Sequence, residues 1–273
     1  MLRVLTLNCW NVSEPFEARM RLVRRWVERL EPDLVGLQEI VVRRDGLDQA
    51  KMALGESYER VFGAAVEWNE RGADCCAGEP PDGAFGNCLA SRWRVRRSEV
   101  RFLPGEETGE RRCVVAALVE APFGLVPFFV THLNWKFDHG YVRERQVLAV
   151  ADLVESWSRE GTFPPVLVGD MNAEPDSDEI RFLCGLRSVG GRSFYLQDAW
   201  RVAGPAEPGY TWDNRNPYAA WNFEPNRRID YIFVGMPDRT GRGWVESVRL
   251  VANEAEDGVF PSDHFGLYAE IRT

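Results

Sequence analysis

The residues best suited to chemistry in this chain are polar side chains that end or interrupt apolar runs. They are Asn8, Glu39, His132, Asp170, Asn172, Asp230, Asp263 and His264. The chain has only three histidines in 273 residues, and two of them belong to this set. An unpaired carboxylate is strongly disfavoured in a protein interior. We therefore expect these groups to face a cleft or a cation.

The acidic and amide members of the set indicate a cation site. Carboxylate and amide oxygens, with no Cys/His cluster among them, are typical of a site for a hard cation such as Mg²⁺ or Mn²⁺ rather than zinc. Mg²⁺ usually takes one or two carboxylates and leaves the rest of its shell to water and substrate phosphate. We therefore expect Glu39 to bind the cation, with help from Asn8 and Asp263.

The remaining members fit the hydrolysis of a phosphate ester. A negatively charged ester repels hydroxide, so such a site needs a cation, donors for the phosphoryl oxygens and a base that aims the water. Asp170 is the candidate base, and Asn172 is the candidate that fixes the water. His132 and His264 are candidates to hydrogen-bond the phosphoryl oxygens, and Asp230 to hold one of these histidines in its tautomer. Each residue taken alone also has a purely structural interpretation, and only the whole set favours a site.

The stretch 166–175, VLVGDMNAEP, shows how such residues are positioned. Its three branched apolar residues predict a short buried strand. Gly169 allows a close backbone approach, and Pro175 prevents the strand from resuming. In an α/β sheet, ligands bind just beyond the carboxyl ends of strands, so Asp170 and Asn172 are expected at the rim of a cleft. A plain turn is the alternative interpretation of GDMN by itself.

The same order of elements occurs twice in the sequence. A strand that ends at Asn8, a helix and a strand that ends at Glu39 are followed later by a strand that ends at His132, a helix and a strand that ends at Asp170. Two halves built alike would pack sheet against sheet with helices outside. This arrangement would bring the four polar strand ends to one edge.

We therefore expect an α/β fold in a single catalytic domain over residues 1–273, with similar halves near 1–122 and 123–273. Three local predictions accompany this expectation. The Gly, Pro and Asp content of 66–85 predicts a loop. Alternating Arg residues in 92–97 predict a half-exposed strand. The segment 176–185 predicts a short helix with a capping box formed by its Asp and Glu.

Composition restricts the class of protein. Apolar residues make up 45% of the chain and charged residues 27%, which is ordinary for a globular protein. The net charge of −9 argues against a protein that coats nucleic acid through broad positive potential. No apolar run approaches the roughly 20 residues that span a bilayer, and no secretory signal is visible, so we expect a cytoplasmic protein. The six cysteines show no zinc spacing, and the role of the adjacent pair Cys75 and Cys76 stays open.

Six motifs in order, TLNCWN, LQEI, VTHL, GDMN, RIDYIF and SDHFGL, resemble the endonuclease/exonuclease/phosphatase superfamily, the deoxyribonuclease I-like metal-dependent phosphodiesterases. The resemblance covers nearly the whole chain. It implies a four-layer α/β sandwich of two mostly antiparallel mixed sheets packed face to face with outer helices. It also implies a Mg²⁺-type cofactor, with the residues named above in the same roles.

The substrate class is less constrained by the sequence. The NCW motif at Asn8–Trp10 looks like neutral sphingomyelinases, whereas YTWD and FPSDHFGL are similar to the 5′-tyrosyl-DNA phosphodiesterase type. The candidate substrate-binding residues are Trp135, Arg145, Trp212 and Trp221. The tryptophans could stack on a base, form an apolar wall for a lipid or small ester, or pack in the core.

The expected partner is therefore a phosphoester substrate: a small molecule, a lipid headgroup or a nucleic-acid end. The sequence implies no obligate protein partner. A protein of a different class, a catalytically silent module that binds phosphate, is the competing hypothesis. The presence of Glu39, Asp170 and His264 argues against it, because binding alone needs no general base.

Overall fold

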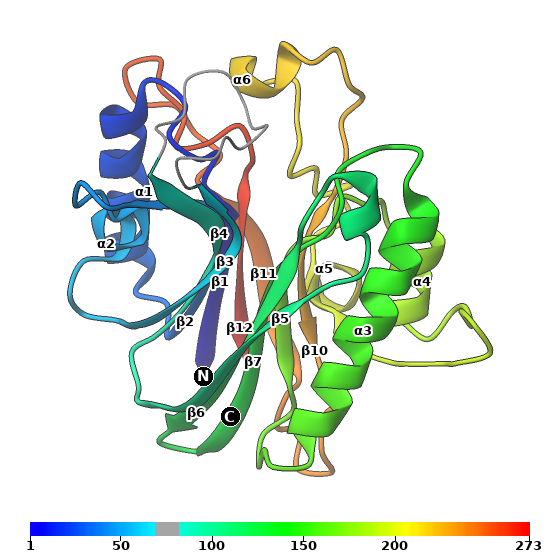
Figure 1. Cartoon of the computed structure of the whole chain (residues 1–273). Helices are drawn as coiled ribbons and strands as arrows, with labels where there is room; N and C mark the ends of the chain where they lie inside the picture. Colours follow the sequence, from blue (N-terminus) through cyan, green and yellow to red (C-terminus); the bar gives the residue numbers. More distant parts are fainter. Residues whose placement is uncertain (69–81) are drawn as a thin grey trace.

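The structure, a computed structural model, describes residues 1–68 and 82–273 (Figure 1). In these residues two six-stranded sheets pack face to face, and helices cover their outer surfaces. The predicted four-layer α/β sandwich is thus confirmed. The pair Cys75 and Cys76 lies outside the described residues.

Both sheets are mixed. The first has the strand order β11-β12-β1-β2-β4-β3. Its strands are β1 (Leu2–Asn8), β2 (Leu34–Arg43), β3 (Glu59–Trp68), β4 (Gly83–Ser91), β11 (Val245–Val251) and β12 (Gly266–Ile271). The second has the order β5-β6-β7-β8-β10-β9. Its strands are β5 (Val95–Phe102), β6 (Cys113–Ala121), β7 (Gly124–His132), β8 (Val166–Asp170), β9 (Gln197–Asp198) and β10 (Asp230–Val234). The pairs β1/β2 and β7/β8 are parallel, and the other neighbours are antiparallel.

The sheets do not follow the expected division of the chain into 1–122 and 123–273. Strands β5 and β6 come from the first of these segments but belong to the second sheet, and β11 and β12 return to the first sheet. Strand β12 pairs antiparallel with β1, so the end of the chain completes the sheet in which it began. Pairing between strands that are distant in sequence leaves no local signal in the sequence. The repeated order of elements therefore did not predict which strands belong to which sheet.

Helices α1 (Phe16–Leu30) and α2 (Gln49–Leu54) lie on the outer face of the first sheet, and α3 (Gly140–Ser158) and α4 (Asp178–Leu183) on that of the second (Figure 1). The short elements η1 (Glu106–Thr108), α5 (Ala199–Ala203) and α6 (Pro217–Ala220) lie in connecting segments. None of the described helices is long and apolar enough to cross a membrane.

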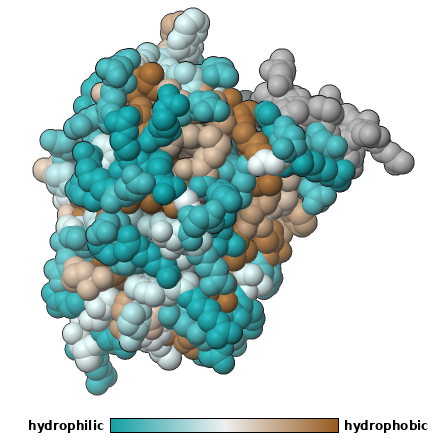
Figure 2. Space-filling view, turned by 90° about the vertical axis from the view of Figure 1, so that its left-hand side faces the viewer, coloured by the Kyte–Doolittle hydropathy of each residue, from teal (hydrophilic) through white to brown (hydrophobic). Residues whose placement is uncertain are grey.

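The spacing of apolar residues explains how α1 packs. Met20, Val23 and Val27 recur at the helical period and are buried against the first sheet, where each contributes about 1.5–3 kcal/mol. Residues between them, such as Arg21 and Arg25, are exposed. Figure 2 shows the side of the molecule on which α1 and α2 lie, and most of this face is hydrophilic.

Several local predictions need correction. The prediction of a loop over 66–85 is wrong at both ends, because β3 runs to Trp68 and β4 begins at Gly83, and residues 69–81 lie outside the described part of the chain. The predicted strand 92–97 begins only at Val95, after a bend. Helix α4 has Ser177 at its N-cap position, with no side-chain cap, so the predicted capping box is wrong. Its glutamate, Glu179, instead binds a buried arginine of α3. Strand β11 was not predicted.

Candidate active site

The register of the second sheet aligns three of the predicted residues. Strand β7 pairs His132 with Asp170 of β8, and β10 pairs Asp230 with the same Asp170. Neighbouring strands lie about 4.8 Å apart, so these side chains lie next to one another on one face. Positions two residues along each strand are apolar and belong to the core between the sheets. The three polar residues therefore form the last row of that core, at the end of the sandwich where α6 lies (Figure 1).

Gly169 makes the close approach of β7 and β8 possible. Its φ is +152°, and a Cβ at this position would lie 1.9 Å from the carbonyl oxygen of Thr131. The expected role of Gly169 in a close backbone approach is therefore confirmed. The next residues form a tight turn, in which the N–H of Asn172 donates to Asp170 Oδ1 over 2.9 Å and its Nδ2 donates to the Leu133 carbonyl.

Asn8 joins the two sheets at the site. It ends β1, and its Nδ2 donates to Asp170 Oδ2 over 3.0 Å and to Glu39 Oε1 over 3.2 Å. Its Oδ1 accepts the N–H of Trp10. Asn8 thus bridges two carboxylates through its nitrogen. The expected arrangement was different, with Asn8 helping Glu39 to bind a cation.

Glu39 reaches the site through a β-bulge. The sequence predicted that this strand ends at Glu39, but β2 continues to Arg43. Its pairing with β4 shifts between Leu37 and Ile40, and Glu39 has a φ of +56°. The extra residue interrupts the alternation of faces, so Gln38 and Glu39 both reach the inner side. Trp10, Asn11 and Asn172 also have positive φ, so strained backbone gathers around this cavity.

Asp263 is the second carboxylate near Glu39. It is buried, and its Oδ1 accepts the Ser262 hydroxyl over 3.1 Å. Burial raises the pKa of Asp263, His264 opposes this rise, and the negative charge of Glu39 adds to it. Two carboxylates that repel each other beside a cavity are a suitable donor set for a hard divalent cation. Glu39 also accepts Asn11 Nδ2 over 3.1 Å, which orients the carboxylate.

A second acidic group, formed by Asp170, Asp230 and His264, has ligand atoms within 4.8 Å of one another. Here His264 Nδ1 lies 2.8 Å from Asp230 Oδ2, and His264 Nε2 lies 3.8 Å from Asp170 Oδ2. Burial lowers the pKa of His264, but the two carboxylates outweigh it and raise the pKa to about 10. The group is therefore better described as an imidazolium held between two carboxylates than as a cation site.

The pKa of Asp170 is raised by burial and, second, by Asp230. His264 and the hydrogen bonds from Asn8 and from the N–H of Asn172 act in the opposite direction. The result is a carboxylate that is less acidic than usual and that accepts several donors. A group of this kind suits a general base near neutral pH.

His132 differs from His264 in its surroundings. Its Nε2 lies 3.4 Å from Asp170 Oδ2, and its Nδ1 lies 3.1 Å from Arg112 Nη1. Burial, followed by the charges of Arg112 and His264, lowers the pKa of His132 well below its ordinary value. The sequence analysis missed Arg112, because an arginine in the charged run before β6 resembles a solvent-exposed residue.

Arg19 is a second residue that the sequence analysis missed. It lies on α1, is completely buried, and its guanidinium donates only to backbone carbonyls, among them Cys9, Asn11 and Pro261. Gln49 Nε2 supports the Asn11 carbonyl over 2.8 Å. Arg19 thus ties the segment after β1 to the segment before Asp263. Its place within an amphipathic helix gave no sign of this role.

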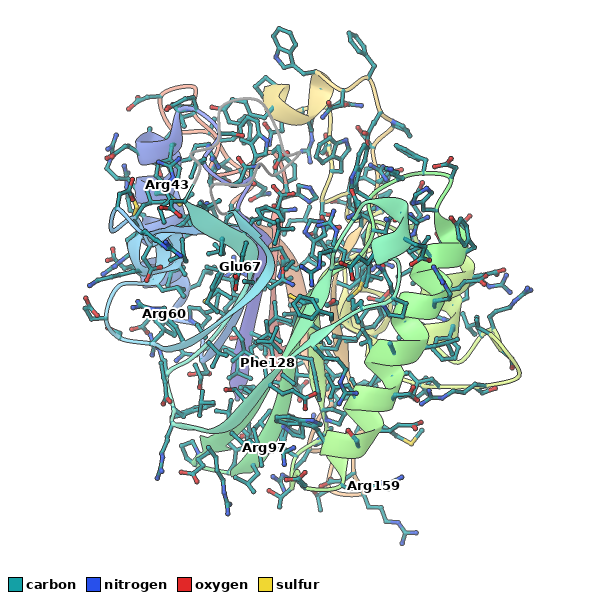
Figure 3. All side chains as sticks on the ribbon, viewed as in Figure 1. Arg43, Arg60, Glu67, Arg97, Phe128 and Arg159 are labelled. Atoms are coloured by element: carbon teal, nitrogen blue, oxygen red, sulfur yellow. The ribbon has the colours of Figure 1, made fainter. Side chains whose placement is uncertain are left out.

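A cavity of about 790 Å³ lies at this site, and Asn8, Asp230 and Arg19 are not among the described residues that line it. The predicted residues on its wall are Glu39, His132, Trp135, Asp170, Asn172, Trp212, Asp263 and His264. Figure 3 shows Phe128 in the core between the sheets, and Arg159 projecting into solvent at the end opposite α6. The apolar core thus lies below the polar row, and the cavity opens above it.

Two predicted substrate-binding residues lie elsewhere. Arg145, on α3, pairs with Glu107. Trp221 is 80% exposed beyond α6. Neither is among the described residues that line the cavity. Trp212 is largely buried and packs edge-on against His264 with ring centroids 5.0 Å apart, so it supports the site as well as lining it.

Comparison with known proteins agrees with this geometry. A model of the Endonuclease/Exonuclease/phosphatase family matches residues 5–264. The chain belongs to this family. Family members are hydrolases that act on phosphoester bonds, and the row of His132, Asp170 and Asp230 lies within the matched segment.

Individual relatives are distant. Nocturnin of Xenopus laevis is 23% identical over 265 residues, which cover 94% of this chain but only 64% of nocturnin. The chain thus spans less than two thirds of that relative. Exodeoxyribonuclease III of Haemophilus influenzae is 25% identical over 285 residues, covering 93% of this chain and 96% of the relative. The crystal structure of D. rerio TDP2 complexed with single strand DNA product superposes with a TM-score of 0.74 at 21% identity, covering 100% of this chain and 99% of that one. At this identity the structural likeness shows the fold of the family.

Proposed function

We propose that this protein is a divalent-cation-dependent hydrolase that cleaves phosphoester bonds, preferably phosphodiesters, by in-line attack of water. The observation that carries the proposal is the convergence of Asn8, His132 and His264 on one carboxylate oxygen of Asp170. These residues come from four separate segments of the chain, and His132, Asp170 and His264 lie on the wall of one cavity. Structural packing alone does not require such a meeting of a carboxylate with two imidazoles.

Asp170 acts as the general base in this proposal. Hydrogen bonds from Asn8 Nδ2 to its Oδ2 and from the N–H of Asn172 to its Oδ1 hold the carboxylate in place, and burial raises its pKa. Asn172 shapes the turn beside it and lines the cavity. A water in front of Asp170 would lose a proton to this carboxylate as it attacks phosphorus.

The two histidines stabilise the charge that develops on the phosphoryl oxygens. His264, held as an imidazolium by Asp230, supplies positive charge. His132 supplies a neutral donor from the neighbouring strand. Preorganised donors of this kind act without reorientation during the reaction, and each is worth roughly 10²–10³ in rate.

Glu39 and Asp263 would hold Mg²⁺ or Mn²⁺, with Asn8 and Asn11 orienting Glu39. When bound, the cation supplies charge stabilisation to the phosphoryl group. The donor set supports a hard cation, because it consists of carboxylates, and the described residues of the cavity wall include no cysteine.

The substrate class within phosphoesters rests on the aromatic wall. Trp10, Trp135 and Trp212 line the cavity, and such a wall suits a nucleobase or another flat or apolar group beside the phosphate. A nucleic-acid end of the 5′-tyrosyl-DNA type is therefore the second candidate, and a sphingomyelinase-like lipid the third. The solved D. rerio TDP2 complex holds a single-stranded DNA product, which supports the second candidate. The cytoplasmic location and the lack of an obligate protein partner stay predictions from the sequence.

The test offers purified protein a bis-aryl phosphate, a choline-phosphate ester and a 5′-tyrosyl DNA, each with Mg²⁺, Mn²⁺ or a chelator. Asp170→Asn is expected to lower kcat/KM by about 10²–10⁴. His264→Ala is expected to lower it by a similar factor. The matched control is Asp152→Asn, which removes an exposed carboxylate of α3 that pairs with Arg192.

Cation-dependent turnover that Asp170→Asn leaves unchanged would refute the assigned role. Binding of phosphate without turnover of any substrate would favour the silent module instead. The relative rates on the three substrates decide between the candidate classes.

A further inference from the structure

One cationic residue outside the predicted set touches the site directly. Arg112 precedes β6, and its Nη1 lies 3.1 Å from His132 Nδ1. A guanidinium is always charged and has only donors. His132 Nδ1 must therefore be the acceptor in this contact, and the ring proton must be on Nε2.

We propose that Arg112 is a positioning residue that locks His132 in its neutral Nε2–H tautomer. In this form Nε2 is a donor aimed at the centre of the site. The proposal rests on the proposed function only in its kinetic part, because the tautomer itself is a property of the free protein.

The geometry around Arg112 makes the lock rigid. The side chain is 8% exposed, and its Nε and Nη2 both contact Glu110 Oε2 at 3.3 Å. Its backbone carbonyl accepts the N–H of Leu103 over 2.8 Å. Leu103 holds the backbone of Arg112, and Glu110 holds Nε and Nη2 of its guanidinium. The remaining nitrogen, Nη1, is therefore directed at His132.

The groups on the other side of His132 are consistent with the same tautomer. Nε2 faces Asp170 Oδ2 at 3.4 Å, which is an acceptor when ionised, and the positively charged His264 lies beyond it. A proton on Nε2 therefore has an acceptor. A second proton on Nδ1 would face the guanidinium, so the doubly protonated ring is disfavoured.

The two histidines are thus held in opposite ways. His264 Nδ1 faces the carboxylate of Asp230 at 2.8 Å and carries a proton, whereas His132 Nδ1 faces Arg112 and carries none. The sequence analysis expected an acidic residue to hold one histidine in its tautomer. The other histidine is held by a cationic hydrogen-bond donor, Arg112.

The decisive experiment is ¹⁵N NMR of the histidine rings in the labelled full-length protein without substrate. The chain has only three histidines, so comparison of the wild-type spectrum with those of His139→Gln and His264→Gln assigns all three. We expect His132 to show an unprotonated Nδ1 and a protonated Nε2 across neutral pH. A protonated Nδ1 in the wild-type protein would overturn the proposal, whatever the variants do.

Variants then test whether Arg112 is the cause. Arg112→Met removes the donor and is expected to give mixed tautomers or a doubly protonated His132 near neutral pH, whereas Arg112→Lys keeps a donor and should retain the wild-type pattern. The matched control is Arg101→Met, at an arginine of β5 that pairs with Glu99. Retention of the wild-type pattern by Arg112→Met would overturn the proposal. If Arg112→Met fails to fold, the wild-type and Arg112→Lys spectra decide.

The kinetic consequence separates positioning from mere stability. In a folded protein with phosphoesterase activity, Arg112→Met should lower kcat by about 10²-fold with a small change in KM, and Arg112→Lys should restore most of it. A large rise in KM with unchanged kcat would show that Arg112 binds substrate and does not position His132. If no substrate is hydrolysed at all, the proposed function fails while the NMR result still stands.

Discussion

Replacing Arg19 by methionine should strongly destabilise the protein, because the guanidinium serves five backbone carbonyls, and two of them have no other donor in the described part of the chain. It donates to the carbonyl oxygens of Cys9, Trp10, Asn11, Ser13 and Pro261 over 2.7–3.3 Å. Methionine has similar length and fills the space but donates no hydrogen bond. The change therefore tests the hydrogen bonds more than the packing.

The magnitude follows from which carbonyls keep another donor. Gln49 Nε2 still reaches Cys9 and Asn11, and the N–H of Ser13 still reaches Trp10. In the described part of the chain, the carbonyls of Ser13 and Pro261 are left without a donor. The Pro261 carbonyl is buried and the Ser13 carbonyl is partly buried. An orphaned buried acceptor costs about 1–3 kcal/mol and a partly buried one less, so we expect the free energy of unfolding to fall by roughly 1–4 kcal/mol.

The assay is urea unfolding followed by tryptophan fluorescence, with the m-value checked for constancy. The control is Arg24→Met on the exposed side of the same helix, which breaks an i,i+4 pair with Glu28 worth about 0.5 kcal/mol or less. Arg19→Lys, with three donors, should fall between wild type and Arg19→Met. If Arg19→Met loses under about 1 kcal/mol, or no more than Arg24→Met, the reasoning is refuted.

Three further predictions follow. Gly169→Ala should lower the free energy of unfolding by at least about 1–3 kcal/mol, because its Cβ meets backbone. The control is Gly191→Ala, at a glycine that also has positive φ but has open space around its Cβ position. If urea unfolding gives equal losses of unfolding free energy for the two variants, the steric clash at Gly169 is not the cause. Burial raises the pKa of Cys88 from 9.0 to about 12, so the unfolded thiol ionises first and stability is lost as pH rises above 9, by about 1.4 kcal/mol per pH unit. Cys88→Ala should flatten the slope of unfolding free energy against pH by that amount, and an unchanged slope would count against burial as the cause. Mg²⁺ should raise the Tm of the wild-type protein in a thermal-shift assay but not that of Glu39→Gln, and a shift retained by the variant would place the cation elsewhere.

The sequence predicted the second sheet's part of the site well, for a physical reason. Asp170 and His132 end apolar runs, and the carboxyl ends of parallel neighbours meet at one edge of a sheet. Asp230 begins β10, which runs antiparallel to β8 in the same sheet. His264 belongs to the first sheet, where it precedes β12, which runs antiparallel to β1. Both kinds of position place a polar side chain at the same end of the sandwich, so pattern alone brought them together.

The first sheet's part was harder to predict. Alternation of faces assigns Glu39 to the outer side of β2, and only the bulge opposite β4 turns it inward. A bulge depends on the register of a partner strand some 50 residues away, which the local sequence does not record. The roles of Arg19 and Arg112 depend in the same way on distant contacts. Arg19, for example, reaches Pro261 from the other end of the chain.

Packing between the sheets sets the distances within the site. Gly36 of β2 faces the second sheet so closely that a Cβ there would lie 2.3 Å from Val168 Cγ2. Gln38, which pairs with Asn8, lies two residues after Gly36 on β2. Asp170 lies two residues after Val168 on β8. Because Asn8 Nδ2 reaches Asp170 over 3.0 Å only when the sheets are this close, the absence of a side chain at Gly36 is a condition for the contact. The apolar core therefore does more than stabilise the sandwich, since its thickness determines whether Glu39 and Asp170 belong to one site.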